Sequence, residues 1–150
     1  MGVLLLLLAA LACQAADLPG TRVEITVSGV SSGTGVVRGA LWSSKAAYLK
    51  SPSDAFRGQA VSAAPGSVTL VFDALPPGEY AFSVFHDENE NQQLDRGAFG
   101  IPKEAYGFSN NALGRMGPPS WDKASFTVPP DGLNLAVRLI RHGRGGAPGS

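Results

Sequence analysis

The sequence predicts an all-β fold: a single antiparallel β-sandwich of the immunoglobulin-like or prealbumin-like Greek-key type, with about seven strands and one long ordered loop. Three observations support this prediction. Apolar and polar residues alternate in several short segments, turns rich in Gly and Pro separate these segments, and no stretch has a helical period of domain-spanning length. Many short strands joined by such turns are typical of a sandwich.

The predicted strands are the segments in which every second residue is apolar. A period of two indicates a half-buried strand, because successive side chains point to opposite faces of the sheet. In chain order the inward positions are Val23, Ile25 and Val27; Val37, Gly39 and Leu41; Val68, Leu70 and Phe72; Tyr80, Phe82 and Val84; Phe126 and Val128; and Leu135, Val137 and Leu139.

Two connections between these strands have features of their own. The crossover at 44–56 contains a few helix-forming residues before Pro52, which predicts a short helix or an irregular segment. Two prolines and a glycine at 76–78 form a sharp corner just before Tyr80. A tyrosine in that place can turn its ring into the core and bond its hydroxyl to the backbone a few residues upstream, as in a tyrosine corner.

The amino end has the pattern of a secretory signal peptide. Residues 3–12 form an uncharged apolar run, shorter than the ~20 residues that cross a bilayer, and small residues follow the run. We therefore assign residues 1–16 to a signal peptide, 17–140 to the β-sandwich and 141–150 to a disordered tail. The protein is expected to be exported, to the periplasm or the extracellular space.

The single cysteine, Cys13, lies inside this leader. Cleavage after the leader leaves a mature chain without a thiol, which excludes both a disulfide and a catalytic cysteine. In an alternative route of processing, Cys13 becomes the acylated first residue and its lipid holds the protein to a membrane. This lipid is the only membrane contact that the sequence predicts.

The charge balance argues against a nucleic-acid partner. Twelve basic and twelve acidic residues give a formal net charge of zero. No basic stripe runs along the chain, and such a stripe is the usual electrostatic footprint of a protein that binds phosphate backbones.

Oxygen-bearing side chains recur at every second position after the strand that starts at Tyr80. This spacing can wrap a loop around a hard cation, and it matches the first part of a calcium loop. We therefore predict a calcium-like cation as the one cofactor, with a ligand set of Asp87, Asn89, Asn91, Gln93 and Asp95.

Two positions depart from the calcium-loop pattern. Gln92 stands where a glycine would make the sharp turn, and Ala98 stands where a bidentate Glu would close the cage. If the loop folds back, Glu104 is the next carboxylate able to take that place. The alternative is a solvated acidic turn, in which the Asn side chains bond backbone groups.

His86 ends the strand that starts at Tyr80, and alternation places it on the inward face with Phe82 and Val84. This position predicts a core or rim histidine bonded to a backbone carbonyl, with a ligand-binding or pH-sensing role as the alternative. Zinc is not expected, because the other histidine, His142, lies in the tail. A hydrolase-like enzyme would have to work from His86 and the acidic loop.

Aromatic residues in the long loop that ends at Trp121 offer another kind of site. Together with Trp42, such rings can form a platform on which a sugar or a peptide stacks. Alternatively the loop folds over one sheet and its rings form a small core, which we favour for Tyr106 and Phe108. The candidate ligand-binding residues are His86, Tyr106, Phe108, Asn110, Asn111 and Trp121.

The runs VFHDENENQQLD and GIPKEAYGFSNNALGRMGPPSW, followed by ASFTV, resemble the exported bacterial proteins grouped as domain of unknown function family 2141. The resemblance covers residues 23–139. It implies export from a bacterial cell and a β-sandwich, and it brings no biochemical activity with it. Members typically carry glycines within the acidic loop, in a form such as DENGNGKLD, where this chain has Glu90 and Gln92.

These observations together predict an exported, non-catalytic module that acts as an envelope-associated binding or accessory protein. Its partner is expected to be a small molecule, a glycan or a protein. The alternatives are a carbohydrate- or peptide-binding module that uses the loop aromatics, and a hydrolase-like enzyme centred on His86.

Overall fold

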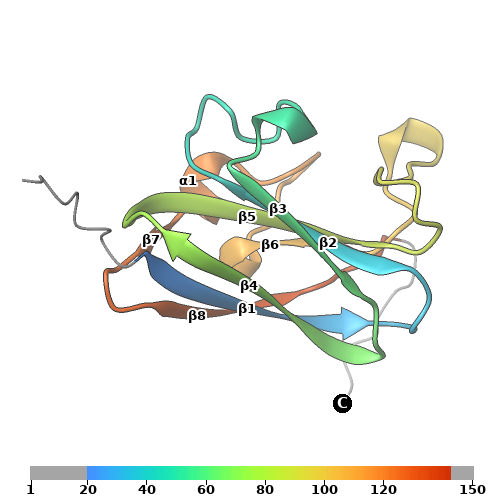
Figure 1. Cartoon of the computed structure of the whole chain (residues 1–150). Helices are drawn as coiled ribbons and strands as arrows, with labels where there is room; N and C mark the ends of the chain where they lie inside the picture. The colour runs from blue at the N-terminus through green and yellow to red at the C-terminus, as the bar shows by residue number, and fades with distance from the viewer. Residues whose placement is uncertain (1–19, 143–150) are drawn as a thin grey trace, which may run out of the picture.

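The computed structural model describes residues 20–142, which form two β-sheets packed face to face (Figure 1). The predicted leader at 1–16, with Cys13, and residues 143–150 lie outside these described residues. Within 20–142 there are eight strands: β1 (Thr21–Val30), β2 (Val36–Trp42), β3 (Arg57–Ser62), β4 (Gly66–Leu75), β5 (Gly78–Asp87), β6 (Tyr106–Phe108), β7 (Phe126–Val128) and β8 (Leu133–Arg138).

The fold class is the predicted all-β sandwich. One sheet has the order β4-β1-β8 and the other the order β3-β2-β5-β6, with β7 paired to the first residues of β5. All pairs are antiparallel except β1 and β8, which run parallel. Parallel neighbours need a crossover, and here the chain supplies it by passing through the other sheet before β8 lies beside β1.

The core lies between the sheets and is built by the predicted alternation. On β1, Val23, Ile25 and Val27 are fully buried while the residues between them are exposed or half-buried. Gly39 on β2 leaves room for Phe82, because a Cβ at that position would lie 2.5 Å from the phenyl ring. The glycine is therefore needed for packing in the middle of a strand that otherwise alternates normally.

Two strands were not predicted. β3 is an edge strand with no fully buried side chain, so its sequence lacks apolar alternation. β6 has three residues, too few for a period to be visible, and it interrupts the long loop that we expected to contain no strand. The remaining elements are one α-helical turn and three 3-10 turns: α1 (Trp121–Ala124), η1 (Pro52–Asp54), η2 (Ala98–Gly100) and η3 (Ser109–Asn111).

The predicted tyrosine corner is present at the start of β5. Tyr80 is buried, and its hydroxyl donates a hydrogen bond of 2.7 Å to the carbonyl oxygen of Pro76. The crossover at 44–56 is irregular, with η1 as its only helical turn. Among residues 20–142, no helix has the length and apolarity required to cross a bilayer.

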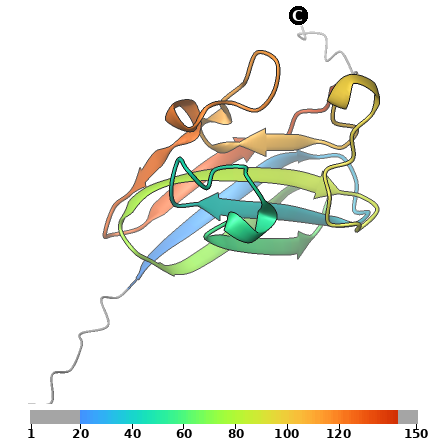
Figure 2. The same cartoon turned by 90° about the horizontal axis from the view of Figure 1, so that it is seen from above.

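A second apolar cluster covers part of the outer face of the five-stranded sheet. We call it the aromatic layer: Trp42 and Ala81 from the sheet, Trp121 and Ala124 from α1, and Tyr48 from the crossover. Figure 2 shows the crossover and the 109–124 segment lying over that face, while the loop that contains η2 rises at the other end of β5. The two ends of this sheet are thus covered by different structures.

Candidate functional site

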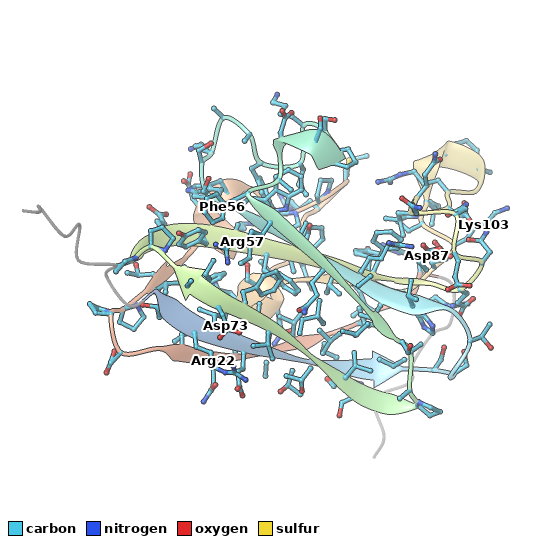
Figure 3. All side chains as sticks on the ribbon, viewed as in Figure 1. Arg22, Phe56, Arg57, Asp73, Asp87 and Lys103 are labelled. Carbon is cyan, nitrogen blue, oxygen red and sulfur yellow. The ribbon has the colours of Figure 1, made fainter. Side chains whose placement is uncertain are left out.

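The acidic loop leaves the end of β5 and begins with a buried carboxylate. The Asp87 side chain is 0% exposed and lies beneath the loop that follows it (Figure 3). Its Oδ1 accepts the backbone N–H of Asn91 at 3.1 Å, and its Oδ2 accepts that of Gln92 at 2.9 Å. Asp87 therefore caps its own loop, whereas the prediction treated it as a ligand or a solvated turn residue.

Arg38 on the neighbouring strand β2 completes this arrangement, with its Nε 2.6 Å from Asp87 Oδ2. Burial alone raises the pKa of the Asp87 carboxyl. The hydrogen bond from Arg38 and those from the backbone of Gln92 and Asn91 outweigh burial, so the pKa lies below its ordinary value. Asp87 is consequently ionised at neutral pH, and a cation at this carboxylate would have to share it with Arg38.

The other predicted cation ligands gather around Asp95. Asn89 and Asn91 each donate a side-chain N–H to a different oxygen of the Asp95 carboxylate, both at 2.7 Å. The Asn91 Oδ1 accepts the backbone N–H of Gln93 at 2.9 Å. Three of the five predicted ligands thus meet, while Asp87 is turned into the loop and Gln93 contributes its backbone N–H.

Glu104 closes the loop from the opposite side through hydrogen bonds, and its role as a cation ligand stays a prediction. It is 4% exposed, and its two oxygens accept the backbone N–H groups of Glu88 at 3.0 Å and Asp95 at 3.1 Å. Over residues 20–142, no three His, Cys, Asp or Glu side chains are arranged to hold a metal ion. The cation therefore stays a prediction, and the loop is closed by its own hydrogen bonds.

His86 has the inward orientation that alternation predicts and is completely buried. Its Nε2 lies 2.7 Å from the carbonyl oxygen of Thr34, so Nε2 carries the hydrogen and donates it. Its Nδ1 has no hydrogen-bond partner among the residues that the structure describes, and the nearest carboxylate oxygen, on Glu88, is 3.9 Å away. The imidazole is thus a core group that no substrate can reach.

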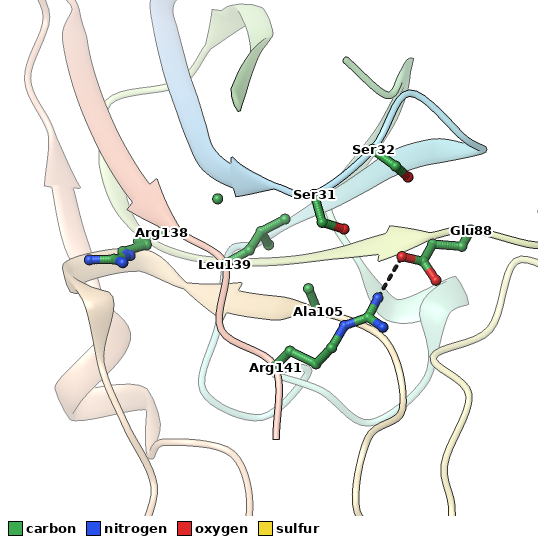
Figure 4. A pocket seen from close by; sticks show the side chains of 8 residues that line it. Ser31, Ser32, Glu88, Ala105, Arg138, Leu139 and Arg141 are labelled. Atoms are coloured by element: carbon green, nitrogen blue, oxygen red, sulfur yellow. Dashed lines mark hydrogen bonds and ion pairs between the residues drawn. The ribbon is translucent and has the colours of Figure 1, made fainter. Parts of the chain in front are cut away.

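A small cavity of about 440 Å³ lies near this histidine, between the ends of β1, β5 and β8. Figure 4 shows Arg141 reaching across it to Glu88, with Ser31 and Ser32 on the opposite side. Arg141 and His142, which we had assigned to the tail, both contact the sandwich, since His142 stacks on Tyr106 with ring centroids 5.7 Å apart. The ion pair partly neutralises the charge within the cavity.

A larger groove, of about 870 Å³, lies on the outer face of the five-stranded sheet. Strand register sets its floor. Arg38 on β2 is opposite Ala60 on β3 and Phe85 on β5, and Phe85 is in turn opposite Tyr106 on β6. These four side chains form one row across the sheet, with an arginine and two half-buried rings in it.

A second row runs parallel to the first. Ala40 is opposite Gly58 and Ser83, and Ser83 is opposite Phe108. The small side chains Ala40 and Ser83 in the middle of this second row keep it low, and the Ser83 hydroxyl accepts the indole N–H of Trp42 at 2.9 Å. The floor is therefore low along the second row, is lined by Arg38 and Phe85 along the first, and is aromatic toward β6.

The walls of the groove stand at opposite ends of the strands (Figure 1). One wall is the crossover at 49–57, which follows β2. The other is the 92–96 part of the acidic loop, which follows β5. Because the walls stand at the strand ends, the groove runs across the strands, from the β3 edge to the β6 edge.

The predicted ligand-binding residues fall into two groups. Tyr106 and Phe108 line the groove, although Phe108 is only 9% exposed. Trp121 is 7% exposed within the aromatic layer, so its ring face is not open to a sugar. Asn110 donates to the carbonyls of Lys123 and Ser125, and Asn111 accepts the backbone N–H of Arg138, so both amides hold the 109–124 segment in place.

The comparison with family models agrees with the resemblance noted in the sequence. A model described as an uncharacterized protein conserved in bacteria, domain of unknown function 2141, matches residues 25–135. The chain belongs to this family. No curated protein and no solved structure matches it. The matched range contains all eight described strands at least in part and includes the entire acidic loop.

Two residues of the acidic loop have a backbone conformation that glycine adopts more easily than other residues. Glu90 and Gln92 have φ of +55° and +64°. These are the positions at which the resemblance noted in the sequence implies glycine, the residue that adopts positive φ without a Cβ clash. The chain thus keeps the loop conformation that glycine favours while using two residues for which it is strained.

The sequence analysis did not identify Arg38, Ser83 and Phe85. Each is an ordinary outward position of a strand, and its importance depends on which residue stands opposite it on the next strand. Register of that kind is set by pairing between distant segments. A search for outward charged or aromatic residues flanked by small ones could have found Arg38 and Phe85 as candidates.

Proposed function

We propose that this chain is an exported, non-catalytic binding module of the bacterial cell envelope that holds an extended glycan in the groove across its five-stranded sheet. The observation that supports this most is the floor of the groove, where rings line up beside small residues and an arginine. Half-exposed rings offer apolar faces to sugar rings, and polar side chains around them offer hydrogen bonds to hydroxyls.

Arg38 contributes to this proposal through its fixed orientation. A guanidinium has five N–H donors, and Asp87 engages the one on Nε. The ion pair holds the side chain in one position beside Phe85 and Ala40, so little side-chain entropy is lost when a ligand accepts from the remaining donors. Preorganisation of this kind favours a rigid ligand such as a sugar chain.

Titration calorimetry with soluble β-glucan and chitin oligosaccharides tests the glycan proposal. Phe85→Ser and Tyr106→Ser should each weaken binding about tenfold, because each removes a stacking face. Phe99→Ser is the matched control, since that ring is 99% exposed away from the groove, and it should bind as the unaltered protein does. If neither oligosaccharide class binds, or if Phe85→Ser binds normally, the proposal fails; binding of an extended peptide to the free β3 edge would replace it.

A second candidate function, binding of a calcium-like cation, is favoured by the convergence of Asn89, Asn91 and Asp95. An amide rotated by half a turn exchanges its N–H₂ group for its oxygen. Rotation of both amides would surround one side of Asp95 with oxygen atoms that can coordinate a hard cation. The cation would have to outweigh the loss of the hydrogen bonds that the amide oxygens now accept from the backbone N–H groups of Asn91 and Gln93.

A thermal melt in EDTA and in millimolar calcium tests this second candidate. Calcium at a hundredfold excess over its dissociation constant should stabilise the fold by about 2.7 kcal/mol. Asp95→Asn should abolish the shift, whereas the exposed Asp122→Asn should retain it. An unchanged midpoint in calcium would identify the loop as a hydrogen-bonded turn that needs no ion.

A hydrolase centred on His86 is not favoured by any of these contacts. The imidazole is 0% exposed and bonded to a backbone carbonyl, so it cannot exchange a proton with a bound substrate. Export is proposed from the leader pattern at 1–16. Mass spectrometry of the secreted chain tests it, and an acylated Cys13 as first residue would replace soluble export by lipid anchoring.

A further inference from the structure

Two loops present large apolar side chains to solvent on the same side of the five-stranded sheet (Figures 1 and 2). Phe99 and Ile101, in and after η2, are 99% and 47% exposed. Leu113 and Met116, between η3 and α1, are 62% and 101% exposed. We call these four residues the tip surface. Single exposed apolar residues are common, but four at the ends of two projecting loops indicate an interaction site.

The first of these loops pairs several of its backbone polar groups within itself. Gly97 N–H donates to the Ile101 carbonyl at 2.7 Å, and the N–H groups of Gly100 and Ile101 donate within the turn, at 3.3 Å each. The Arg96 guanidinium donates to the Gly100 carbonyl at 2.9 Å. Because unpaired backbone groups are costly outside water, this pairing suits a turn that enters an apolar environment.

The exposed charged residues within the two loops that carry the tip surface have one sign. Arg96, Lys103 and Arg115 are exposed and flank the apolar residues, and Figure 3 shows Lys103 at the outer side of its loop. The one acidic residue between 96 and 120 is Glu104, which is buried and occupied by two backbone N–H groups. Apolar tips with basic neighbours match an anionic lipid surface, which attracts cations and accepts apolar side chains.

We propose that the tip surface docks this protein onto anionic lipid bilayers, with Phe99, Ile101, Leu113 and Met116 in the interface and Arg96, Lys103 and Arg115 at the phosphate level. Projecting, separate tips fit a deformable lipid surface better than they fit a second copy of the chain, which needs a continuous complementary patch. The four apolar residues of the tip surface do not line the groove, although Arg96 also belongs to its 92–96 wall, so their insertion into lipid does not depend on a glycan ligand.

Vesicle sedimentation tests this inference with a chain that starts at residue 17, because the apolar leader would itself bind lipid. The eight strands that the structure describes lie within 20–142, so this chain keeps the described sandwich. In EDTA, it should bind vesicles that contain phosphatidylglycerol and bind pure phosphatidylcholine several-fold less. Phe99→Ser with Met116→Ser should lower the partition coefficient at least about tenfold. Both residues are exposed, so the melting midpoint should be unchanged.

Charge variants separate attraction from insertion. Lys103→Glu with Arg115→Glu should remove the preference for anionic vesicles. Arg22→Glu is the matched control, since Arg22 lies on β1 in the other sheet (Figure 3) and should leave binding unchanged. In Phe99→Trp, vesicles should shift the added indole emission to shorter wavelength. Absence of vesicle binding, equal binding by the Phe99 and Met116 double variant, or a concentration-dependent dimer that this variant abolishes would each overturn the proposal.

Discussion

The aromatic layer and the acidic loop cover opposite ends of the same sheet, yet they are held by different forces. In the aromatic layer the Tyr48 ring meets Trp42 and Trp121 edge to face, with centroids 6.2 and 5.7 Å away. In the acidic loop the corresponding contacts are made by the carboxylates of Asp87 and Glu104, which accept backbone N–H groups.

This difference determines how the stability of each end depends on pH. Packed rings exclude water, and their contribution does not depend on ionisation until a tyrosine titrates. A buried carboxylate that accepts hydrogen bonds stabilises its loop only while it is ionised. The aromatic layer and the acidic loop should therefore lose stability at opposite ends of the pH scale, and variants can disrupt each of them separately.

The largest effect is expected from Trp121→Ala, which removes the largest side chain contributed by α1 to the aromatic layer. The ring is 7% exposed, so its loss should lower the free energy of unfolding by about 3–5 kcal/mol. Urea denaturation measures this. Met116→Ala, at a fully exposed position of the same segment, should change stability by less than about 0.5 kcal/mol. Equal effects from both variants would mean that the aromatic layer contributes no packing energy.

Asp87→Asn should have the next largest effect. It leaves Arg38 without its carboxylate and weakens the bonds to the N–H groups of Asn91 and Gln92, at a cost of about 3 kcal/mol. Asp122→Asn is the matched control, because its ion pair with Lys45 is exposed and such pairs contribute about 0–1 kcal/mol. A small loss in Asp87→Asn would show that the acidic loop is held mainly by Glu104.

The pH dependence of stability follows from the same carboxyl. The pKa of Asp87 is lowered in the folded protein, so its contribution is present above the ordinary value and is lost as the pH falls through the folded pKa. The folded protein should consequently lose stability in acid. When the free energy of unfolding is measured by denaturation at a series of pH values, it should fall less steeply in acid for Asp87→Asn than for the unaltered protein. An equally steep fall would assign the loss to other carboxyls.

The sequence predicted the central strands well, because each buries one face and so carries a visible period. β3 was not predicted because an edge strand with exposed side chains has no such period, and β6 was not predicted because it is only three residues long. The acidic loop was located from its Asp and Asn spacing. The role of Asp87 was not predicted, since its partner Arg38 is identified only by the register between β2 and β5.

The acidic loop should become more stable when its backbone strain is relieved. Gln92 has φ of +64°, so Gln92→Gly should raise the free energy of unfolding by about 0.5–1 kcal/mol, once the entropy of the added glycine is subtracted. Gln93→Gly is the control at a neighbouring position without positive φ, and it should be destabilising. If both glycines destabilise equally, the positive φ of Gln92 does not strain this loop.

The smallest effect at neutral pH is expected from Tyr48→Phe. This variant tests how the aromatic layer, unlike the acidic loop, responds to alkaline pH. The Tyr48 hydroxyl donates to the Pro119 carbonyl at 3.2 Å, and its loss should cost about 0.5 kcal/mol. Burial raises the pKa of Tyr48 to about 12, so the neutral phenol favours the folded state. Its contribution is complete below the ordinary value near 10 and is lost between pH 10 and about 12.

Phenolate absorbance and urea denaturation across this range test the assignment. Among the three tyrosines of the chain, Tyr48 should ionise last. The stability of Tyr48→Phe should fall less in alkali than that of the unaltered protein, and its loss of stability in acid should be unchanged. Asp87→Asn should show the reverse pattern. If both variants change the stability over the same pH range, the aromatic layer and the acidic loop unfold as one unit. Their different contacts then do not confer separate responses to pH.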